Sequence, residues 1–303
     1  MSASPKTKAH IALLTANFLF GVNFSIVKLI SPSLILPFAL NLMRVLVATG
    51  LFWLMFLFRP VNGKILKKDI PRFLLCAVTG IAINQLLFIK GLTLSTPIHA
   101  ALLILGTPVF ILILALITGT EKRSLMKILG LFTALIGGLI LVLSKENSVL
   151  GSDVLLGDIF ILINAISYAF YMLLVKPLTK TYSPLKLTRW VFTFGLFLIL
   201  PFCWHDFTLT QWALFTPASW TALGLVVIGA TFLSYLFIAY GIHHLSPSVT
   251  GAYIYTQPVF SAVIAILFLK EEPALYKLIA AILIFSGVYM INRKTSGEKT
   301  ENQ

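Results

Sequence analysis

The chain has 303 residues, of which 58% are hydrophobic and 11% are charged. Soluble domains carry about a quarter charged residues, so this composition excludes a soluble enzyme and a disordered chain. The net charge of +13 lies on short polar spacers between long apolar runs, a pattern typical of membrane topology rather than of nucleic-acid binding. Cys76 and Cys203 both lie in apolar stretches, and their spacing indicates neither a disulfide framework nor a metal site.

Ten apolar runs follow one another along the chain, and each is long enough to cross a membrane as a helix of about 20 residues. The first run is too long for a signal-peptide core and leads directly into another apolar run, so we expect it to be retained. The sequence therefore predicts an all-α membrane protein with ten transmembrane helices. In chain order the runs cover residues 10–30, 34–58, 72–93, 97–118, 125–143, 156–175, 186–203, 219–241, 247–269 and 275–292.

Lys and Arg are distributed unevenly over the segments that connect these runs. If the N-terminus is cytoplasmic, 16 of the 23 basic residues fall in cytoplasmic segments, whereas the outer loops hold only Lys145, Lys270 and Lys277. An excess of Lys and Arg marks the cytoplasmic side of a membrane protein. We therefore predict a multi-pass protein of the plasma (inner) membrane with both termini in the cytoplasm.

The two halves of the chain share a common pattern. When the chain is shifted by 150 residues, the segment 84–143 aligns with 234–293 without a gap, and 12 of the 60 aligned positions are identical. Upstream of this segment the match needs a shift of 148, which pairs Lys28 with Lys176. The identical positions include Gly91 and Gly241, Pro97 and Pro247, Pro108 and Pro258, Glu121 and Glu271, and Gly137 and Gly287.

Five crossings in each half place the second half upside down relative to the first. Many secondary transporters use such inverted-topology repeats for alternating access. We therefore predict two inverted five-helix repeats, at residues 1–146 and 155–293, followed by a polar C-terminal tail at 294–303. Gene duplication in a structural membrane protein is the alternative interpretation of the same pattern.

Several segments are similar to the motifs of a known family. The segment 20–24 (Phe-Gly-Val-Asn-Phe), followed by Lys28, is similar to a Trp-Gly-x-Asn-Phe opening, with phenylalanine in place of the tryptophan. Arg44 matches an arginine common in the second helix, and 97–121 and 247–271 both match the motif Pro–x₁₀–Pro-Val-Phe–x₁₀–Glu. In these features the whole chain resembles the EamA family of the drug/metabolite transporter superfamily. The resemblance implies a ten-helix carrier that moves small metabolites, often amino acids and usually outward.

Ionisable side chains inside a membrane are costly and are therefore functional candidates by default. The predicted crossings hold Lys28, Arg44, Lys90, His99 and Arg189, but no Asp or Glu lies near a helix centre. An exporter of lipophilic cations would be expected to present a carboxylate in the membrane, so this asymmetry favours a solute that is zwitterionic or carries a carboxylate. It also leaves proton coupling through a buried acid without a candidate.

Arg44 lies near mid-depth of its crossing, about 10 residues at 1.5 Å each from the outer end. Its guanidinium is well shaped to bind a substrate carboxylate, but it could equally be an architectural arginine bonded to backbone carbonyls. His99 could titrate during transport, bind substrate, or bond to a neighbouring helix.

Neutral polar and aromatic side chains recur on one face of several predicted helices in both repeats. Interhelical hydrogen bonding explains any one of them, but their convergence favours a central cavity between the repeats. The residues predicted to bind substrate there are Asn17, Asn23, Arg44, Gln85, His99, Tyr168, Tyr235, Tyr253 and Gln257.

Prolines fall at matching positions of the two repeats. Pro97 and Pro247 begin predicted helices, where the missing N–H costs little. Pro108 and Pro258 fall within predicted helices, where each removes a backbone hydrogen bond and kinks the helix. We predict that these prolines act at gates, and a static kink for packing is the alternative.

The expected function is secondary transport, as an exporter, of a small polar metabolite such as an amino acid or another carboxylate-bearing solute. The alternatives are a multidrug or toxic-compound exporter of the same fold and, less favoured, a membrane-embedded transferase, since His243 and His244 adjoin no acidic residue. We expect no enzymatic activity, cofactor or metal. The expected partners are the solute and membrane lipid but no nucleic acid, and both a monomer and a homodimer remain open.

Overall fold

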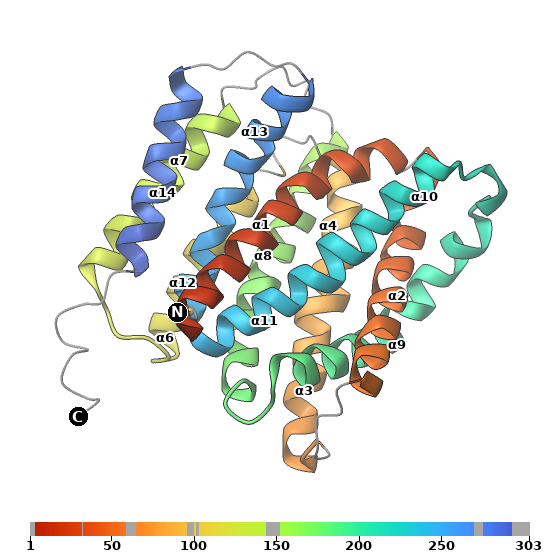
Figure 1. Cartoon of the computed structure of the whole chain (residues 1–303), viewed down its shortest axis with the longest axis horizontal. Helices are drawn as coiled ribbons and strands as arrows, with labels where there is room; N and C mark the ends of the chain where they lie inside the picture. The colour runs from red at the N-terminus through yellow and green to blue at the C-terminus, as the bar shows by residue number, and fades with distance from the viewer. Residues whose placement is uncertain are drawn as a thin grey trace.

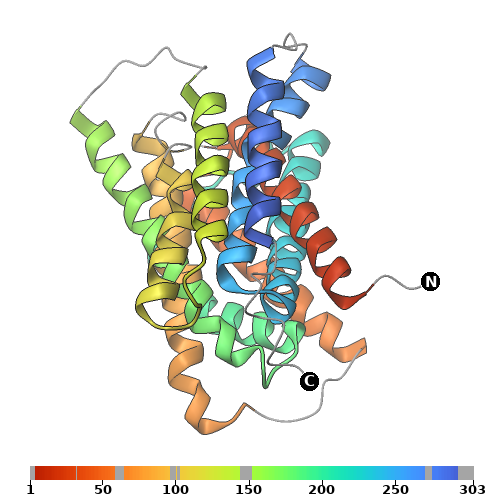
Figure 2. The ribbon, with the colours of Figure 1, turned by 90° about the vertical axis from the view of Figure 1, so that its left-hand side faces the viewer.

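A computed structural model describes residues 4–31, 33–58, 65–95, 100, 103–143, 152–269 and 275–292. Over these residues the chain forms helices joined by short turns, with no strand, so the predicted all-α fold is confirmed for the described part. The helices lie side by side in one bundle (Figure 1). The start of the first helix and the end of the last both lie toward the same end of this bundle (Figure 2).

Two helices of the first half are interrupted in the part of the bundle that holds the site described below. A π-helical segment, Val78–Ala82, joins α3 to α4, and a turn at Gly106 precedes α6. The helices of this half are α1 (Pro5–Ile30), α2 (Pro37–Phe58), α3 (Ile70–Ala77), α4 (Ile83–Leu94), α6 (Thr107–Ile117) and α7 (Leu125–Leu143).

The second half shows interruptions at corresponding places. A π-helical segment, Leu225–Leu233, joins α10 to α11, and a 3₁₀ turn, Tyr253–Tyr255, joins α12 to α13. The helices of this half are α8 (Ser152–Leu178), α9 (Pro184–Leu209), α10 (Pro217–Gly224), α11 (Ser234–His244), α12 (Pro247–Ala252), α13 (Thr256–Leu269) and α14 (Leu275–Asn292).

The described helices have the length and composition of membrane spans. Five are long and apolar enough to cross a bilayer: Pro37–Phe58, Lys67–Leu94, Val154–Leu178, Pro184–Leu209 and Pro217–His244. Shorter apolar helices cover Leu103–Ile117, Leu125–Ile140 and Leu278–Asn292. The chain is therefore a multi-pass membrane protein. The count of ten crossings stays a prediction, because only five of the described helices meet the length and composition of a span, and part of the fourth run lies outside the described residues.

A recurring dipeptide starts several helices. Ser or Thr stands at the N-cap and Pro follows at the first helical position, where its fixed φ suits the helix and its missing N–H costs little. Each cap oxygen accepts a hydrogen bond from a backbone N–H in the first turn, so these local residues favour helix starts at these positions. The caps are Ser4 for α1, Ser183 for α9, Thr216 for α10 and Ser246 for α12.

The last helices of the two halves, α7 and α14, pack closely against each other, as both ribbon views show (Figures 1 and 2). A Cβ on Gly130 would lie 2.7 Å from the carbonyl oxygen of Gly287, and a Cβ on Gly137 would lie 2.8 Å from that of Ala280. Only glycine permits backbones this close. At a shift of 150 residues, Gly130 corresponds to Ala280 and Gly137 to Gly287. The two contacts are therefore equivalent, as expected of two helices related by the repeat.

Candidate functional site

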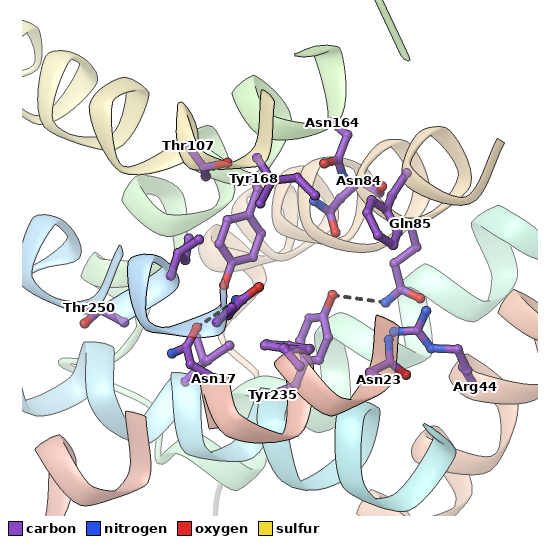
Figure 3. Close-up of a pocket in the computed structure, with 16 residues that line it drawn as sticks. Asn17, Asn23, Arg44, Asn84, Gln85, Thr107, Asn164, Tyr168, Tyr235 and Thr250 are labelled. Atoms are coloured by element: carbon purple, nitrogen blue, oxygen red, sulfur yellow. Dashed lines mark hydrogen bonds between the residues drawn. The ribbon is translucent and has the colours of Figure 1, made fainter. Parts of the chain in front are cut away.

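A cavity of about 120 Å³ lies inside the bundle (Figure 3). Helices of both halves line it, so it lies where the two halves meet. The lining side chains are Asn17, Phe20, Asn23, Arg44, Asn84, Gln85, Phe88, Ile104, Thr107, Asn164, Tyr168, Tyr235, Ile238, Thr250, Ile254 and Gln257.

The lining repeats the symmetry of the sequence. Gln85 Nε2 donates a hydrogen bond to the hydroxyl of Tyr235 at 3.1 Å, and these two residues occupy the same position in the two repeats. The cavity is therefore built from equivalent faces of equivalent helices. The other equivalent pairs that line it are Phe88 and Ile238, Ile104 and Ile254, and Thr107 and Gln257, all at a shift of 150, and Phe20 and Tyr168 at 148.

One end of the cavity is cationic. Arg44 on α2 is the one charged residue among the described side chains that line it, and its side chain is only 5% exposed. Figure 3 shows Asn23, Gln85 and Tyr235 at the same end. The side-chain oxygens Oδ1 of Asn23 and Oε1 of Gln85 are buried and accept no hydrogen bond from any described group. This end therefore presents a cation beside unused acceptors.

Within the described residues the Arg44 side chain makes one hydrogen bond, and its partner is a neutral side chain. Its Nε donates a hydrogen bond to Oγ1 of Thr231 at 2.9 Å, and Thr231 Oγ1 in turn donates to the carbonyl of Val226 at 3.0 Å. Thr231 lies in the π-helical segment Leu225–Leu233 and is fully buried. Within the part of the chain that the structure describes, no carboxylate pairs with this guanidinium.

The remaining polar side chains of the described lining are neutral. Gln257 Nε2 on α13 donates to Asn17 Oδ1 on α1 at 2.8 Å, and Asn17 Nδ2 donates to the carbonyl of Leu13 at 2.8 Å. Asn164 Nδ2 on α8 donates to the carbonyl of Asn84 at 2.6 Å. These bonds tie α1 to α13 and α8 to α4, so helices of opposite repeats are joined around the cavity.

The structure brings most of the predicted binding residues together. Tyr253 is not among the lining residues, because the lining face of α12 and α13 passes through positions 250, 254 and 257, spaced at i, i+4 and i+7. Its hydroxyl is instead hydrogen-bonded to His10 Nδ1 at 2.7 Å and to Asn292 Nδ2 at 3.4 Å. His99 lies outside the described residues. The predicted residues that line the cavity are Asn17, Asn23, Arg44, Gln85, Tyr168, Tyr235 and Gln257.

The prolines mark the helix interruptions. Pro247 begins α12 as predicted, and Pro97 lies outside the described residues. Pro108 and Pro258 do not sit within unbroken helices: each follows directly on an interruption, in the first turn of α6 and of α13. A proline disrupts the helix at the residue four before it, which here is Ile104 or Ile254. Both of these line the cavity, so the breaks lie at its wall.

Four apolar lining residues escaped prediction because their type carries no signal. Phe88, Ile104, Ile238 and Ile254 have the composition of side chains that face lipid, and only their helical spacing from polar neighbours could have marked them. The sequence also predicts that the polar residues Asn84, Thr107, Asn164 and Thr250 turn inward, but an interhelical hydrogen bond explains each of them equally well, so they were not assigned to the solute. Among the described residues, no group of three or more His, Cys, Asp or Glu could hold a metal ion.

The profile of the EamA-like transporter family matches residues 7–143 and again residues 155–293. The chain belongs to this family. It is therefore a transporter-family protein of the drug/metabolite transporter superfamily, as the sequence resemblance predicted.

Known relatives of this EamA-family chain agree with that assignment. An uncharacterized transporter of Archaeoglobus fulgidus is 24% identical over 95% of this chain and 98% of its own length. A probable terminal-alkyne amino-acid exporter of Streptantibioticus cattleyicolor is 28% identical over 77% of both chains. A solved crystal structure with 16% identity superposes with a TM-score of 0.78 over 94% of this chain and 96% of the other, which shows a shared fold.

Proposed function

We propose that this protein is a secondary transporter that exports a small polar metabolite carrying a carboxylate, such as an amino acid. The observation that carries the proposal is Arg44, a buried guanidinium that lines the cavity between the halves without a carboxylate partner among the described residues. A buried charge is costly unless it is paired. A solute carboxylate would supply the missing partner through the planar donor fork of the arginine.

The kind of solute receives support from one relative. The Streptantibioticus cattleyicolor protein is named a probable terminal-alkyne amino-acid exporter. An amino acid carries a carboxylate for Arg44 and N–H donors for the side-chain oxygens of Asn23 and Gln85, which accept no hydrogen bond from the described groups. We therefore extend the direction of transport and this class of solute to the present chain.

We propose that transport proceeds by alternating access at the cavity. The site lies between two repeats, and rocking of one repeat against the other would expose it first to one side of the membrane and then to the other. Pro108 and Pro258 stand where the regular hydrogen bonding of the cavity helices is broken, which is where these helices can bend at least cost. We assign them, with Pro97 and Pro247, to the gates.

The cellular setting follows from the sequence. We propose a place in the plasma (inner) membrane with both termini cytoplasmic, because Lys and Arg concentrate in the segments that this orientation leaves inside.

A second candidate function, export of aromatic or toxic compounds by the same fold, is favoured by one feature of the cavity. Four aromatic side chains form part of its wall: Phe20, Phe88, Tyr168 and Tyr235. The cationic end argues against lipophilic cations as the cargo, because an unpaired guanidinium would repel them.

Transport by the purified protein in liposomes tests the proposal. The panel is an amino acid, its deaminated acid, its amide and a lipophilic cation. We expect transport of the solutes that carry a carboxylate, and Arg44→Lys should lower it about tenfold while leaving transport of the amide unchanged. The control is Arg123→Lys in an exposed turn outside the cavity.

Two results would contradict the assignment. An equal loss of amide transport in the Arg44→Lys protein would make Arg44 an architectural residue. Transport of the cation but not of the acids would favour the multidrug alternative.

A further inference from the structure

We infer that Thr231 is a positioning residue, which aims the guanidinium of Arg44 at the carboxylate of the solute. The inference rests on the proposed function, because it concerns how the same cavity selects its cargo. It names a residue that does not line the cavity and that sequence patterns did not single out.

The hydrogen bonds at Thr231 have a fixed direction. The carbonyl of Val226 can only accept, so the single hydroxyl proton of Thr231 points to it, at 3.0 Å. The lone pairs of Oγ1 are then left to accept from Arg44 Nε, at 2.9 Å. Because both side chains are buried, no bulk water competes for these bonds.

This arrangement leaves the two terminal amino groups of Arg44 available as hydrogen-bond donors. A guanidinium has five N–H donors, of which Nε carries one. The bond from Nε is the one hydrogen bond that Arg44 makes within the described structure. Held at Nε, the side chain cannot rotate freely, and its two terminal amino groups remain free to bind both oxygens of a carboxylate.

The π-helical backbone sets the direction of the Thr231 hydroxyl. In an α-helix a threonine hydroxyl bonds to the carbonyl four residues earlier, as Thr49 on α2 does to Val45 at 2.6 Å. Thr231 reaches five residues back, to Val226, and Ser234 likewise reaches Gly229 at 3.0 Å. The wider turn therefore turns the hydroxyl in a direction that an α-helical turn would not give.

A comparison of equivalent positions in the two repeats argues against a purely architectural role for the pair of Thr231 and Arg44. The positions equivalent to Thr231 and Arg44 in the opposite halves are Ile81, at a shift of 150, and Phe192, at 148. Both are apolar and fully buried. Ile81 also lies in a π-helical segment, Val78–Ala82. The fold thus forms the same backbone feature without a polar pair, so the pair in one half serves something other than packing.

The test compares two substitutions of Thr231 with a matched control. Thr231→Val keeps the shape of the side chain and removes both hydrogen bonds, whereas Thr231→Ser keeps the hydroxyl. Thr49→Val removes another buried hydroxyl, on α2 and outside the cavity lining. Each variant is purified, reconstituted in liposomes and assayed with an amino acid and with its amide.

We expect Thr231→Val to raise KM for the amino acid about tenfold, with little change in the maximal rate or in transport of the amide. Thr231→Ser and Thr49→Val should both retain the KM of the unmodified protein. The inference is overturned if Thr231→Val leaves KM unchanged, raises it equally for the amide, or is not rescued by serine. Should the valine variant fail to insert, Thr231→Ala is measured in the same way.

The Arg44→Lys variant distinguishes a failure of the proposed function from a failure of the positioning role of Thr231. If it transports the amino acid normally, the contact between Arg44 and the carboxylate is wrong, and Thr231 has nothing to aim. If Arg44→Lys is impaired while Thr231→Val is not, the proposed function stands and only the positioning role of Thr231 is overturned.

Discussion

Single residues decide the chemistry of this cavity, because its wall is otherwise neutral. Arg44 supplies the charge, and the side-chain oxygens of Asn23 and Gln85, which accept no hydrogen bond from any described group, add acceptors beside it. An unpaired cation and unmet acceptors are expensive in a protein interior. Their cost is offset only when something binds to them, which is why the charged end is the most informative part of the site.

Gln257 and Tyr253 provide a contrast at this scale. Gln257 lines the cavity and bonds to Asn17, whereas Tyr253 bonds outside it to His10 and Asn292. We expect Gln257→Leu to lower transport several-fold with normal membrane insertion. Tyr253→Phe removes only the hydroxyl and should lower thermal stability by about 1 kcal/mol while leaving KM unchanged.

Flux measurements in liposomes and thermal unfolding in detergent check this pair. Unchanged transport in the Gln257 variant would remove that residue from the proposed site. A raised KM in Tyr253→Phe would return Tyr253 to it.

At the scale of elements, one carboxylate joins the two halves at the end of the bundle where α12 begins. Glu121, in the turn between α6 and α7, pairs with Lys127 Nζ at 2.8 Å and accepts a hydrogen bond from the backbone N–H of Ser248 at 3.0 Å. Its side chain is 4% exposed. Sequence reasoning had no means of showing this contact, because Glu121 and Ser248 lie 127 residues apart.

Glu121 gives the fold a defined dependence on pH. Burial alone would raise the pKa of its carboxyl, but the bonds from Lys127 and Ser248 outweigh burial and the pKa is lowered. A carboxyl whose pKa is lowered in the folded state stabilises that state at pH values above its ordinary pKa of about 4.3. This stabilisation is lost as the pH falls through the lowered pKa. We expect Glu121→Gln to unfold about 2–5 °C lower at pH 7.

Thermal unfolding in detergent between pH 8 and pH 3 measures this contribution. The difference between the two proteins should stay constant down to about pH 5 and vanish in stronger acid. Lys127→Met, which removes the partner, should reproduce the loss at neutral pH. A difference that persists undiminished in strong acid would show that Glu121 acts through shape and not charge.

At the scale of the whole molecule, the paired features of the two halves belong together. The π-helical segments Val78–Ala82 and Leu225–Leu233, the helix breaks before Pro108 and Pro258, and the packing of α7 on α14 all occur at equivalent positions. The cavity lies between the two halves, and Ile104 and Ile254 at the helix breaks form part of its wall. A site at the junction of two repeats can be reached from either side when one repeat moves, so the architecture suits a carrier.

Orientation is the prediction that belongs to this scale. The distribution of Lys and Arg predicts that both termini are cytoplasmic. A tag placed at either end should therefore resist external protease and membrane-impermeant labels in intact cells and become accessible after lysis. Accessibility of either tag in intact cells would refute this topology and, with it, the inverted arrangement of the repeats.

Family membership, the helical fold and membrane insertion could be predicted from the sequence, because each leaves a local or repeated trace. Long apolar runs predict spans, Pro247 predicts the start of a helix, and the shift of 150 residues predicts which positions correspond. Placing Gln85, Tyr235 and Gln257 on inward faces needed only helical spacing and the cost of exposing polar groups to lipid.

What only the tertiary structure decided is which side chains meet. Tyr253 and Ile254 are neighbours in the chain, but only Ile254 lines the cavity. In an apolar helix no sequence pattern shows which of the two faces inward. The partnership of Arg44 with Thr231 depends on a π-helical turn, which no composition signals, and on the packing of helices from opposite halves. Sequence by itself determined that a basic residue lies in the membrane without an acid nearby along the chain. The fold decided what holds that residue, because contacts between distant segments form only when the helices pack.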